Sequence, residues 1–333
     1  MAGAVLVTGG CGYVGSQFVW TLRDAGIPVV VLDDLRTGHR AALPPGVPLV
    51  EVPVQDTAEV AAALRAQGVE AVAHFAASVS VAESVARPLE YWRNNLGGTL
   101  ALLEACAAAG VRRVLLSSTA AVYGVPERVP VAEDAPTRPV SPYGSSKLAA
   151  EAVLAEAGAA HGLQVAALRY FNVAGADPAC RAGSRHADPT HLIGAALQVA
   201  LGRREALTVF GQDWPTADGT AVRDFVHVAD IAEAHLVVLR ALAAGAAPGI
   251  CNVGYGQGSS VRQVVDAVRR VTGHPLPVRM APRRAGDVAE VVAAPDRLLA
   301  LGWRPRHAAL DTMVAHAWAW AQKVARPAQD PPA

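Results

Sequence analysis

The sequence predicts an α/β protein with a doubly wound parallel sheet and a smaller C-terminal α/β lobe. Short apolar runs alternate with helical patterns through the first half of the chain, as they do in successive strand–helix–strand units. After residue 171 this alternation gives way to a long loop rich in glycine and proline, followed by shorter elements. We therefore expect a first domain over residues 1–171, a second lobe over 172–325 from which the chain can cross back to the first, and a tail over 326–333.

The first element is a short apolar strand at residues 4–8, directly followed by Gly9, Gly12 and Gly15. Apolar residues then recur at helical spacing from Val14 up to Gly26. Glycine lets the backbone pass close to a bulky group, and the start of a helix presents free N–H groups and the positive end of its dipole. The order of strand, glycine turn and helix therefore indicates an anion site, best suited to a pyrophosphate.

The second strand, at residues 29–32, ends directly at Asp33. A carboxylate in this position can accept hydrogen bonds from both hydroxyls of an adenosine ribose, and it would repel a 2′-phosphate. The alternative is that Asp33 and Asp34 only begin a solvated loop. With the complete order of elements before it, the acidic residue predicts NAD rather than NADP.

The remaining elements follow from apolar runs and their boundary residues. Asp56 is the expected N-cap of a helix over 57–66, and Gly110 ends a long helix over 88–109. The other strands of the first half are predicted at 49–52, 69–76, 111–118 and 164–170, with a second long helix at 142–160. In the second half we expect helices at 190–202, 228–243, 259–272 and 308–323, and strands at 206–209, 249–253 and 276–280.

Charge and cysteine content exclude several classes of protein. Lysine plus arginine and aspartate plus glutamate number 29 each, so no basic surface for nucleic acid or an anionic membrane is predicted. The four cysteines are scattered without a spacing typical of zinc or redox sites, and the first residues lack a signal-peptide pattern. No apolar run is long enough to span a bilayer. We expect a cytoplasmic protein with no metal ion and neither nucleic acid nor membrane as a partner.

Tyr143 and Lys147 lie four residues apart in the helix predicted over 142–160, so both project from one face. A phenol is a poor base at neutral pH, but a nearby ammonium and a cationic nicotinamide would favour its phenolate. Thr119, at the end of the preceding strand, offers a hydroxyl for the same substrate oxygen. Taken alone, such a pair is better explained as an exposed surface pair. After a dinucleotide-type strand and turn, it indicates an acid–base site.

Motifs along nearly the whole chain carry a family resemblance. They are 8–15 (TGGCGYVG), 74–77 (HFAA), 94–95 (NN), 117–119 (SST), 122–124 (VYG), 143–147 (YGSSK), 168–172 (LRYFN), 222–228 (VRDFVHV) and 282–287 (PRRAGD). Together they resemble the extended short-chain dehydrogenase/reductase superfamily, and within it the UDP-glucose 4-epimerase family. The resemblance implies a Rossmann-type NAD-binding domain over 1–171 and a mainly substrate-binding lobe over 172–325.

The resemblance also implies a role for each matching residue. Tyr143 would be the general base and acid, Lys147 would bind the nicotinamide ribose and lower the pKa of Tyr143, and Thr119 would stand where the family has Ser or Thr. NAD would be held by Gly9, Gly12, Tyr13, Val14, Gly15, Asp33, Asp34, Phe75, Ala76, Ala77, Asn94, Lys147 and Tyr170. The UDP-sugar would be held by Thr119, Tyr143, Asn172, His191, Leu192, Phe210, Arg223, Arg284 and Asp287.

Within the implied substrate set, the arginines suit the diphosphate, Phe210 would lie near the uracil and Asp287 on the ribose. The implied reaction is the reversible C4 epimerisation of a UDP-hexose through a 4-keto sugar. Related dehydratases and decarboxylases carry an acid two residues after the threonine, where this chain has Ala121. Val291 stands where relatives carry a tyrosine or a smaller residue. A small side chain there predicts that UDP-GlcNAc and UDP-GalNAc are accepted besides UDP-glucose and UDP-galactose.

Two alternatives to this function stay open. The motifs specify the nucleotide better than the sugar, so a UDP-pentose or UDP-uronate 4-epimerase is the second enzyme class. A non-catalytic NAD-binding sensor is the third reading, and the intact Thr119, Tyr143 and Lys147 argue against it. The resemblance further implies a place in galactose metabolism and a homodimer formed through the helices at 88–109 and 142–160, whose apolar outer faces suit an interface.

Overall fold

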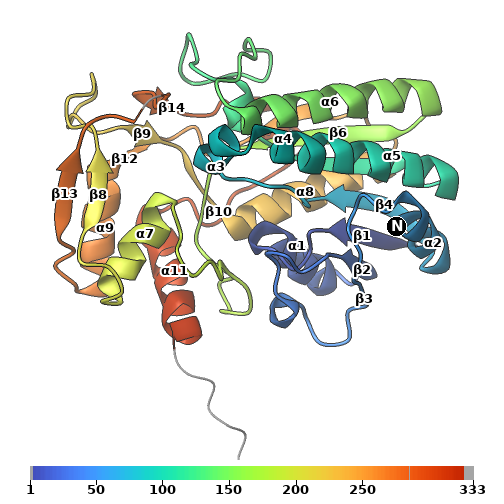
Figure 1. Cartoon of the computed structure of the whole chain (residues 1–333), viewed down its shortest axis with the longest axis horizontal. Coiled ribbons are helices and arrows are strands. Elements are labelled where there is room, and N and C mark those ends of the chain that lie inside the picture. The colour runs from blue at the N-terminus through green and yellow to red at the C-terminus, as the bar shows by residue number, and fades with distance from the viewer. Residues whose placement is uncertain (1–2, 285, 326–333) are drawn as a thin grey trace, which may run out of the picture.

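A seven-stranded parallel sheet forms the centre of the computed structural model, which describes residues 3–284 and 286–325. Its strands stand in the order β11-β6-β5-β4-β1-β2-β3 (Figure 1). In chain order they are β1 (Ala4–Thr8), β2 (Val29–Leu32), β3 (Leu49–Val50), β4 (Val69–His74), β5 (Arg113–Thr119), β6 (Gln164–Tyr170) and β11 (Gly249–Val253). The predicted doubly wound α/β fold is confirmed. The chain leaves β1 in one direction and returns to β4 on its other side, which places a crevice at the carboxyl ends of these two strands.

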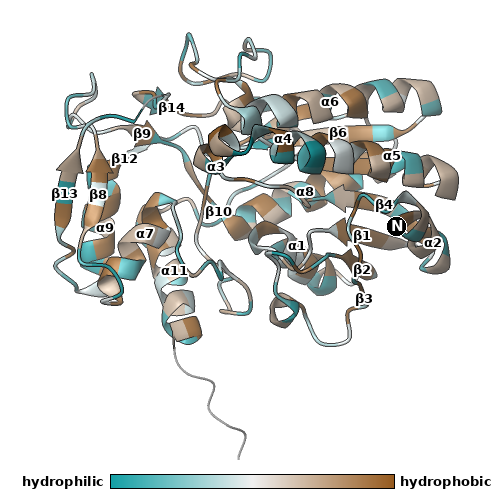
Figure 2. Cartoon of the chain, viewed as in Figure 1, coloured by the Kyte–Doolittle hydropathy of each residue, from teal (hydrophilic) through white to brown (hydrophobic). Residues whose placement is uncertain are grey.

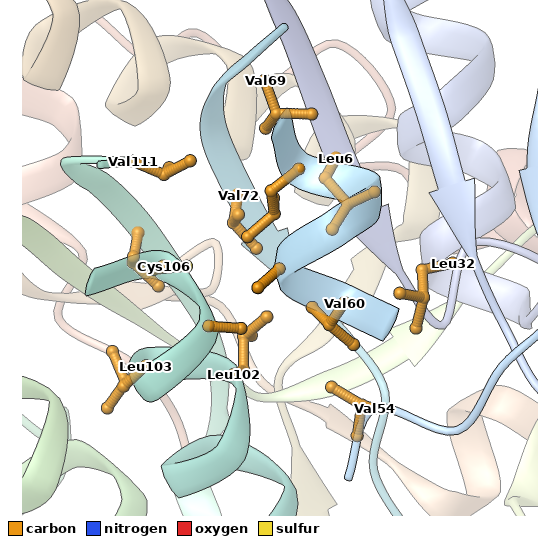
Figure 3. Close-up of a cluster of buried hydrophobic side chains, with 14 of the residues drawn as sticks. Leu6, Leu32, Val54, Val60, Val69, Val72, Leu102, Leu103, Cys106 and Val111 are labelled. Carbon is orange, nitrogen blue, oxygen red and sulfur yellow. The ribbon is translucent and has the colours of Figure 1, made fainter. Parts of the chain in front are cut away.

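Helices cover both faces of this sheet. Val5 and Val7 of β1 pack on one face with α1 (Tyr13–Asp24) and α8 (Val228–Ala243). Leu6 packs on the opposite face, in a cluster with side chains from three other helices. Figure 3 shows Leu6 and Val72 of the sheet directed toward Val60 and Leu102. These helices are α2 (Thr57–Ala66), α5 (Gly98–Ala109) and α6 (Pro142–His161). Burial on both faces explains why the strands are apolar at successive positions.

The second lobe is built from small sheets packed on helices (Figure 1). Its strand pairs are β7 (Asn172–Ala174) with β10 (Phe225–His227), β8 (Leu207–Phe210) with β13 (Val278–Ala281), and the triplet β12 (Ser259–Ser260), β9 (Val222–Arg223) and β14 (Glu290–Val291). Its helices are α7 (Leu192–Ala200), α9 (Val261–Thr272) and α11 (Leu310–Ala325), whereas α10 (Asp296–Ala300) packs on β11 of the first sheet. Between these elements the chain returns to the first sheet, because α8 packs against α1 and β11 pairs with β6. The domain boundary at residue 171 therefore stays a prediction, and the predicted tail over 326–333 lies outside the described residues.

The prediction of one continuous helix over residues 88–109 was wrong, because the α-helix is interrupted near its middle. The chain forms α4 (Pro88–Tyr91), a π-helical turn η2 (Trp92–Gly97) and then α5. Within the turn, the buried Asn95 side chain donates to the Ser78 carbonyl at 3.0 Å and to Ser146 Oγ at 3.0 Å. A π turn inserts an extra residue into the helix, and such turns are frequent at functional sites.

A short helix, α3 (Val81–Ala86), was not predicted although its start carries a capping signal. Ser80 accepts a hydrogen bond from the Glu83 N–H at 3.2 Å, which matches the Ser-x-x-Glu pattern of a helix start. The predicted N-cap of α2 is confirmed, because Asp56 accepts a hydrogen bond from the Glu59 N–H at 3.2 Å. Most other predicted elements are present with slightly different ends, whereas the short strands β7, β9, β10, β12 and β14 were missed.

Candidate active site

The glycine turn after β1 is packed so tightly that side chains are excluded from it. Gly9 has a φ of 67°, and a Cβ there would lie 2.6 Å from the Ala76 amide nitrogen. A Cβ on Gly15 would lie 2.2 Å from the Gly9 carbonyl oxygen. These contacts bring the first turn of α1 directly onto the end of β1, beside the chain that follows β4.

Gly12 is the N-cap of α1, and within the described chain no side chain caps this helix end. The backbone N–H groups of Tyr13 and Val14 are thus left for a ligand, which fits the predicted pyrophosphate of NAD. The Tyr13 side chain itself is turned away from this role, because its hydroxyl donates to the Gly175 carbonyl at 2.5 Å. This bond joins the glycine turn to the start of the second lobe.

Asp33 lies at the carboxyl end of β2, beside the glycine turn, and is only 7% exposed. Its two carboxylate oxygens accept hydrogen bonds from the N–H groups of Cys11 and Leu35, each at 2.9 Å. Burial raises the pKa of Asp33, and these backbone bonds oppose the rise. The predicted neighbour Asp34 pairs instead with Arg36 at 2.5 Å.

The chain after β4 forms the opposite wall of the crevice. Phe75 packs against Phe18 and His235, with ring centroids 5.6 Å and 4.7 Å away. Ala76 and Ala77 follow, and their small side chains leave backbone exposed to the crevice. Tyr170, at the end of β6, contacts the same histidine as Phe75: its hydroxyl is 2.5 Å from Nε2 of His235.

Asn94 projects from the π turn and connects three segments at the outer end of the crevice. Its side-chain oxygen accepts from Arg36 Nη2 at 2.9 Å and Gln55 Nε2 at 3.2 Å, and its amide nitrogen donates to Ser78 Oγ at 3.1 Å. The predicted cofactor residues from β1, β2, β4 and the π turn are thus found along one edge of the sheet.

The first turn of α6 places Tyr143 beside the end of β5. Ser141 caps the helix by accepting a hydrogen bond from the Gly144 N–H at 3.2 Å. A Cβ on Gly144 would lie 2.6 Å from the Ala121 carbonyl oxygen, so glycine lets this turn approach the chain that follows Thr119. The Tyr143 ring meets Tyr91 edge to face with centroids 6.4 Å apart. The helix thereby brings the phenol to the threonine that ends β5.

Burial and a neighbouring threonine both act on the pKa of Tyr143. Burial raises this pKa above the usual value for tyrosine, and a hydrogen bond with the Thr119 side chain lowers it in part. The prediction that Lys147 lowers the pKa of Tyr143 stays a prediction, because burial and Thr119 are the influences resolved here. A cationic ring held next to the phenol would act in the lowering direction.

Lys147 lies one helical turn further and is only 3% exposed. Burial lowers the pKa of its ammonium to about 8, while the charge of Glu151 opposes this change. The buried His74 lies close enough that the lysine charge, together with burial, lowers the histidine pKa to about 3. His74 is therefore neutral at physiological pH, and Lys147 has Glu151 as its counter-charge.

The second lobe brings four of the predicted substrate residues together in two pairs. The Arg284 guanidinium lies 3.7 Å from the centroid of the Phe210 ring. Arg223 in β9 is half-buried; burial lowers its pKa and the charge of Asp287 opposes the change. An aromatic face and two cations thus lie at one end of the lobe, a composition that suits a base and a diphosphate.

Three other predicted substrate residues lie elsewhere in the lobe. His191 caps α7 by accepting a hydrogen bond from the Gly194 N–H at its Nδ1, at 3.1 Å, and Leu192 begins this helix. The His191 side chain lines a pocket together with Tyr13, Gly175 and Trp320. Asn172 begins β7, where it is exposed. Neither Arg223 nor Arg284 lines the His191 pocket.

Comparison with known proteins identifies the family. The model of the "NAD dependent epimerase/dehydratase family" matches residues 5–254, which is most of the chain. The chain belongs to the NAD-dependent epimerase/dehydratase family. A UDP-glucose 4-epimerase of Azospirillum brasilense is 51% identical over 317 residues, which cover 95% of this chain and 91% of that protein.

Solved structures of this epimerase/dehydratase family are similar over nearly the whole chain. The UDP-glucose 4-epimerase of Brucella ovis in complex with NAD has a TM-score of 0.93 and 41% identity, covering 96% of this chain and 99% of that one. The UDP-Glc/GlcNAc 4-epimerase of Campylobacter jejuni has a TM-score of 0.85 and 38% identity, covering 97% of this chain and all of that one. These findings confirm the predicted NAD-dependent epimerase and favour the UDP-hexose function over the pentose, uronate and sensor alternatives.

Sequence reasoning missed several buried polar residues close to the predicted acid–base residue Lys147. Glu151, Arg169 and Ser118 form a hydrogen-bonded cluster behind Lys147. Glu151 follows Lys147 by four residues, so helical spacing was a usable signal for it. No local pattern indicated Arg169, because its place opposite the carboxylate depends on the pairing of β5 with β6.

Proposed function

We propose that this chain interconverts UDP-glucose and UDP-galactose with a resident NAD, and that Tyr143 is its general base and acid. The position of Tyr143 carries this proposal. The phenol lies beside Thr119 at the carboxyl ends of the strands, on the same edge of the sheet as the glycine turn that fits a pyrophosphate. An acid–base group and a dinucleotide site on one crevice are what a reversible sugar oxidation needs.

Each protein group has a defined task in this proposal. Tyr143 accepts the proton of the sugar 4-hydroxyl and later returns it, while Thr119 donates a hydrogen bond to the same oxygen. NAD, when bound, supplies the acceptor and donor of the C4 hydride. Lys147, one helical turn after Tyr143, provides the positive charge on this face of α6. Ala121, in the 3₁₀ turn η3 (Ala120–Val122), offers no acid for an elimination, so the 4-keto sugar is reduced again.

The proposed substrate contacts place the nucleotide in the second lobe. Arg223 and Arg284 would bind the diphosphate, with Phe210 beside the uracil and Asp287 on the ribose. The proximity of Arg284 to Phe210 and of Arg223 to Asp287 supports this arrangement. Asn172, His191 and Leu192 complete the proposed set.

Product analysis tests the function directly. Purified protein without added cofactor is incubated separately with UDP-galactose, UDP-GalNAc, UDP-xylose and UDP-glucuronate, and the products are identified by NMR. We expect inversion at C4 of the UDP-hexose, with NAD recovered only on denaturation. Inversion confined to the pentose or the uronate would assign the alternative substrate class. Bound NAD without any product would point to the sensor.

We also propose that N-acetylated UDP-hexoses are substrates, because Val291 is small and close to the substrate lobe. Val291 pairs with Arg223 in the β9–β14 ladder, so its side chain stands next to a proposed diphosphate residue. The Campylobacter jejuni relative is named for both a plain and an N-acetylated hexose. A short side chain at this place leaves volume for a 2-acetamido group.

A Val291→Tyr variant tests this sugar range. We expect kcat/KM for UDP-GalNAc to fall by about tenfold or more, since overpacking a filled pocket costs about 1–3 kcal/mol. UDP-galactose turnover is expected to stay close to that of the parent protein, and a Val291→Ala control should keep both activities. Equal kinetics of the Tyr variant and the parent on UDP-GalNAc would reject the proposal.

We propose a homodimer formed through α5 and α6. These helices pack side by side (Figure 1), and both carry mostly apolar residues (Figure 2). Leu100 on α5 is 42% exposed, and small residues such as Ala152 and Ala159 are exposed on α6. A second copy of the same helix pair would cover these apolar side chains.

A Leu100→Arg variant is expected to be monomeric at concentrations where the parent sediments as a dimer, because the arginine would bring a charge into the interface. Leu299→Arg is the matched control, since this leucine on α10 is 38% exposed outside the two helices. Analytical ultracentrifugation separates the two cases. A parent protein that sediments as a monomer, or a dimer that survives the Leu100 change, would argue against this interface.

Location and pathway are part of the same proposal. Of the helices in residues 3–284 and 286–325, none is long and apolar enough to cross a membrane. We propose the cytoplasm because Cys11, Cys106, Cys180 and Cys251 are all free thiols, as a reducing compartment favours. Galactose metabolism is the proposed pathway.

A further inference from the structure

A buried carboxylate lies directly behind Lys147. Glu151 follows the lysine by one helical turn and is only 5% exposed. Its two oxygens accept hydrogen bonds from Arg169, from Nε at 3.0 Å to Oε1 and from Nη2 at 2.6 Å to Oε2. Ser118 Oγ donates a further bond to Oε1. The carboxylate is therefore held at both oxygens and has no freedom to turn toward solvent.

The two groups that hold Glu151 come from neighbouring strands. Ser118 in β5 and Arg169 in β6 are register partners, so both side chains leave the sheet on the side that α6 covers. Arg169 is fixed in turn, because its Nη1 donates to the Glu133 carbonyl at 3.3 Å and its guanidinium lies 4.8 Å from the Tyr123 ring centroid. The sheet thus sets the position of the carboxylate, and the carboxylate lies on the helix that carries the acid–base pair.

His74, a second titratable group near Lys147, carries no charge at physiological pH. Thr99 donates its hydroxyl to the Asn95 carbonyl at 2.7 Å, so at 3.3 Å it accepts from the Nε2–H of His74. Nδ1 of the same ring then accepts from the Thr8 hydroxyl at 2.7 Å. His74 is therefore held as a neutral tautomer, in agreement with its low pKa. Tyr143, on the same helix face, is neutral as a phenol.

We propose that Glu151, clamped by Arg169 and Ser118 one helical turn from Lys147, is the positioning residue that keeps the buried Lys147 ammonium charged. The inference rests on the proposed role of Lys147 in epimerisation. The carboxylate is the single anion of this buried cluster, facing the two cations Lys147 and Arg169. Without it, Lys147 loses the neighbouring negative charge that opposes the effect of burial, and a lysine, unlike an arginine, can then lose its proton.

The composition of the chain makes the charge on Lys147 directly measurable. Lys147 and Lys323 are its two lysines, and Lys323 is exposed. NMR of protein labelled with ¹³C at lysine Cε should therefore give two signals, which a Lys323→Arg variant assigns. In the parent we expect Lys147 to titrate at about 8. This measurement does not require turnover.

A Glu151→Gln variant removes the charge and keeps the shape of the side chain. We expect the Lys147 signal to titrate at a pKa lower by about 1 or more, and the alkaline limb of the kcat profile to move to lower pH with it. The KM for UDP-galactose should stay unchanged. Glu156→Gln is the matched control, because Glu156 is exposed on the same helix and should leave both profiles as in the parent.

In the Glu151→Gln variant Arg169 is buried without its carboxylate partner, which can prevent folding. A double variant then provides the test. Glu151→Gln/Arg169→Met removes both charges, and we expect Lys147 to titrate below the parent because the lost carboxylate is its neighbour on the helix. A Lys147 signal that titrates as in the parent, in whichever variant folds, overturns the proposal. A lowered Lys147 titration with an unmoved kcat profile supports the charge role of Glu151 and contradicts the proposed role of Lys147 in epimerisation.

Discussion

Replacing Tyr143 by Phe is expected to lower kcat for UDP-galactose by about a thousandfold, within the range that positioned acid–base groups supply. The variant loses one hydroxyl, on whose pKa the Thr119 side chain acts, and keeps the ring and its contact with Tyr91. The fold and the bound NAD should therefore stay intact. The loss reflects the missing group that takes the 4-hydroxyl proton and returns it.

Steady-state kinetics, the melting temperature and the NAD content of the same sample give the three readouts for this prediction. Tyr91→Phe is the matched control, because Tyr91 touches the Tyr143 ring but bonds Glu83 and Ser80 through its hydroxyl. Its kcat is expected to remain within about tenfold of the parent, since it holds no proton in the reaction. Turnover by the Tyr143→Phe variant at the parental rate would remove the basis of the proposed mechanism.

Replacing Gly15 by Ala should empty the cofactor site. The added methyl group would lie 2.2 Å from the Gly9 carbonyl oxygen, and backbone cannot yield as a flexible side chain can. α1 must then move away from β1, which separates the N–H groups of its first turn from the pyrophosphate position. We expect the protein to purify without NAD and its free energy of unfolding to fall by about 1–3 kcal/mol.

Cofactor content by absorbance after denaturation, together with chemical unfolding, measures both effects of the Gly15 change. Gly97→Ala serves as the control, because a Cβ on Gly97 meets no atom within 4 Å. That variant should keep NAD and the parental stability. A Gly15→Ala protein that retains its full complement of NAD would show that the turn tolerates a side chain, contrary to the close packing described here.

The elements that were predicted correctly are those whose sequence signals lie close together in the chain. The glycine turn, the Asp56 cap and the strands that alternate with helices were all recognised correctly, because spacing and capping depend on residues within one or two turns. The π turn at 92–97 was not, because it depends on Asn95 bonding to Ser78 and Ser146 from distant segments. The spacing of apolar residues does not reveal the extra residue of a π turn when contacts with distant segments stabilise it.

The sequence by itself determined the class of fold, the glycine turn after β1 and the placing of Tyr143 and Lys147 on one helix, since each depends on residues close together in the chain. Only the tertiary structure decided which charges meet. The contact of Arg284 with Phe210, the return of β11 to the first sheet and the clamp on Glu151 join segments that lie far apart in sequence. Burial then set the pKa of Tyr143 and Lys147. Desolvation depends on every neighbour in space, and a linear pattern reports only neighbours along the chain.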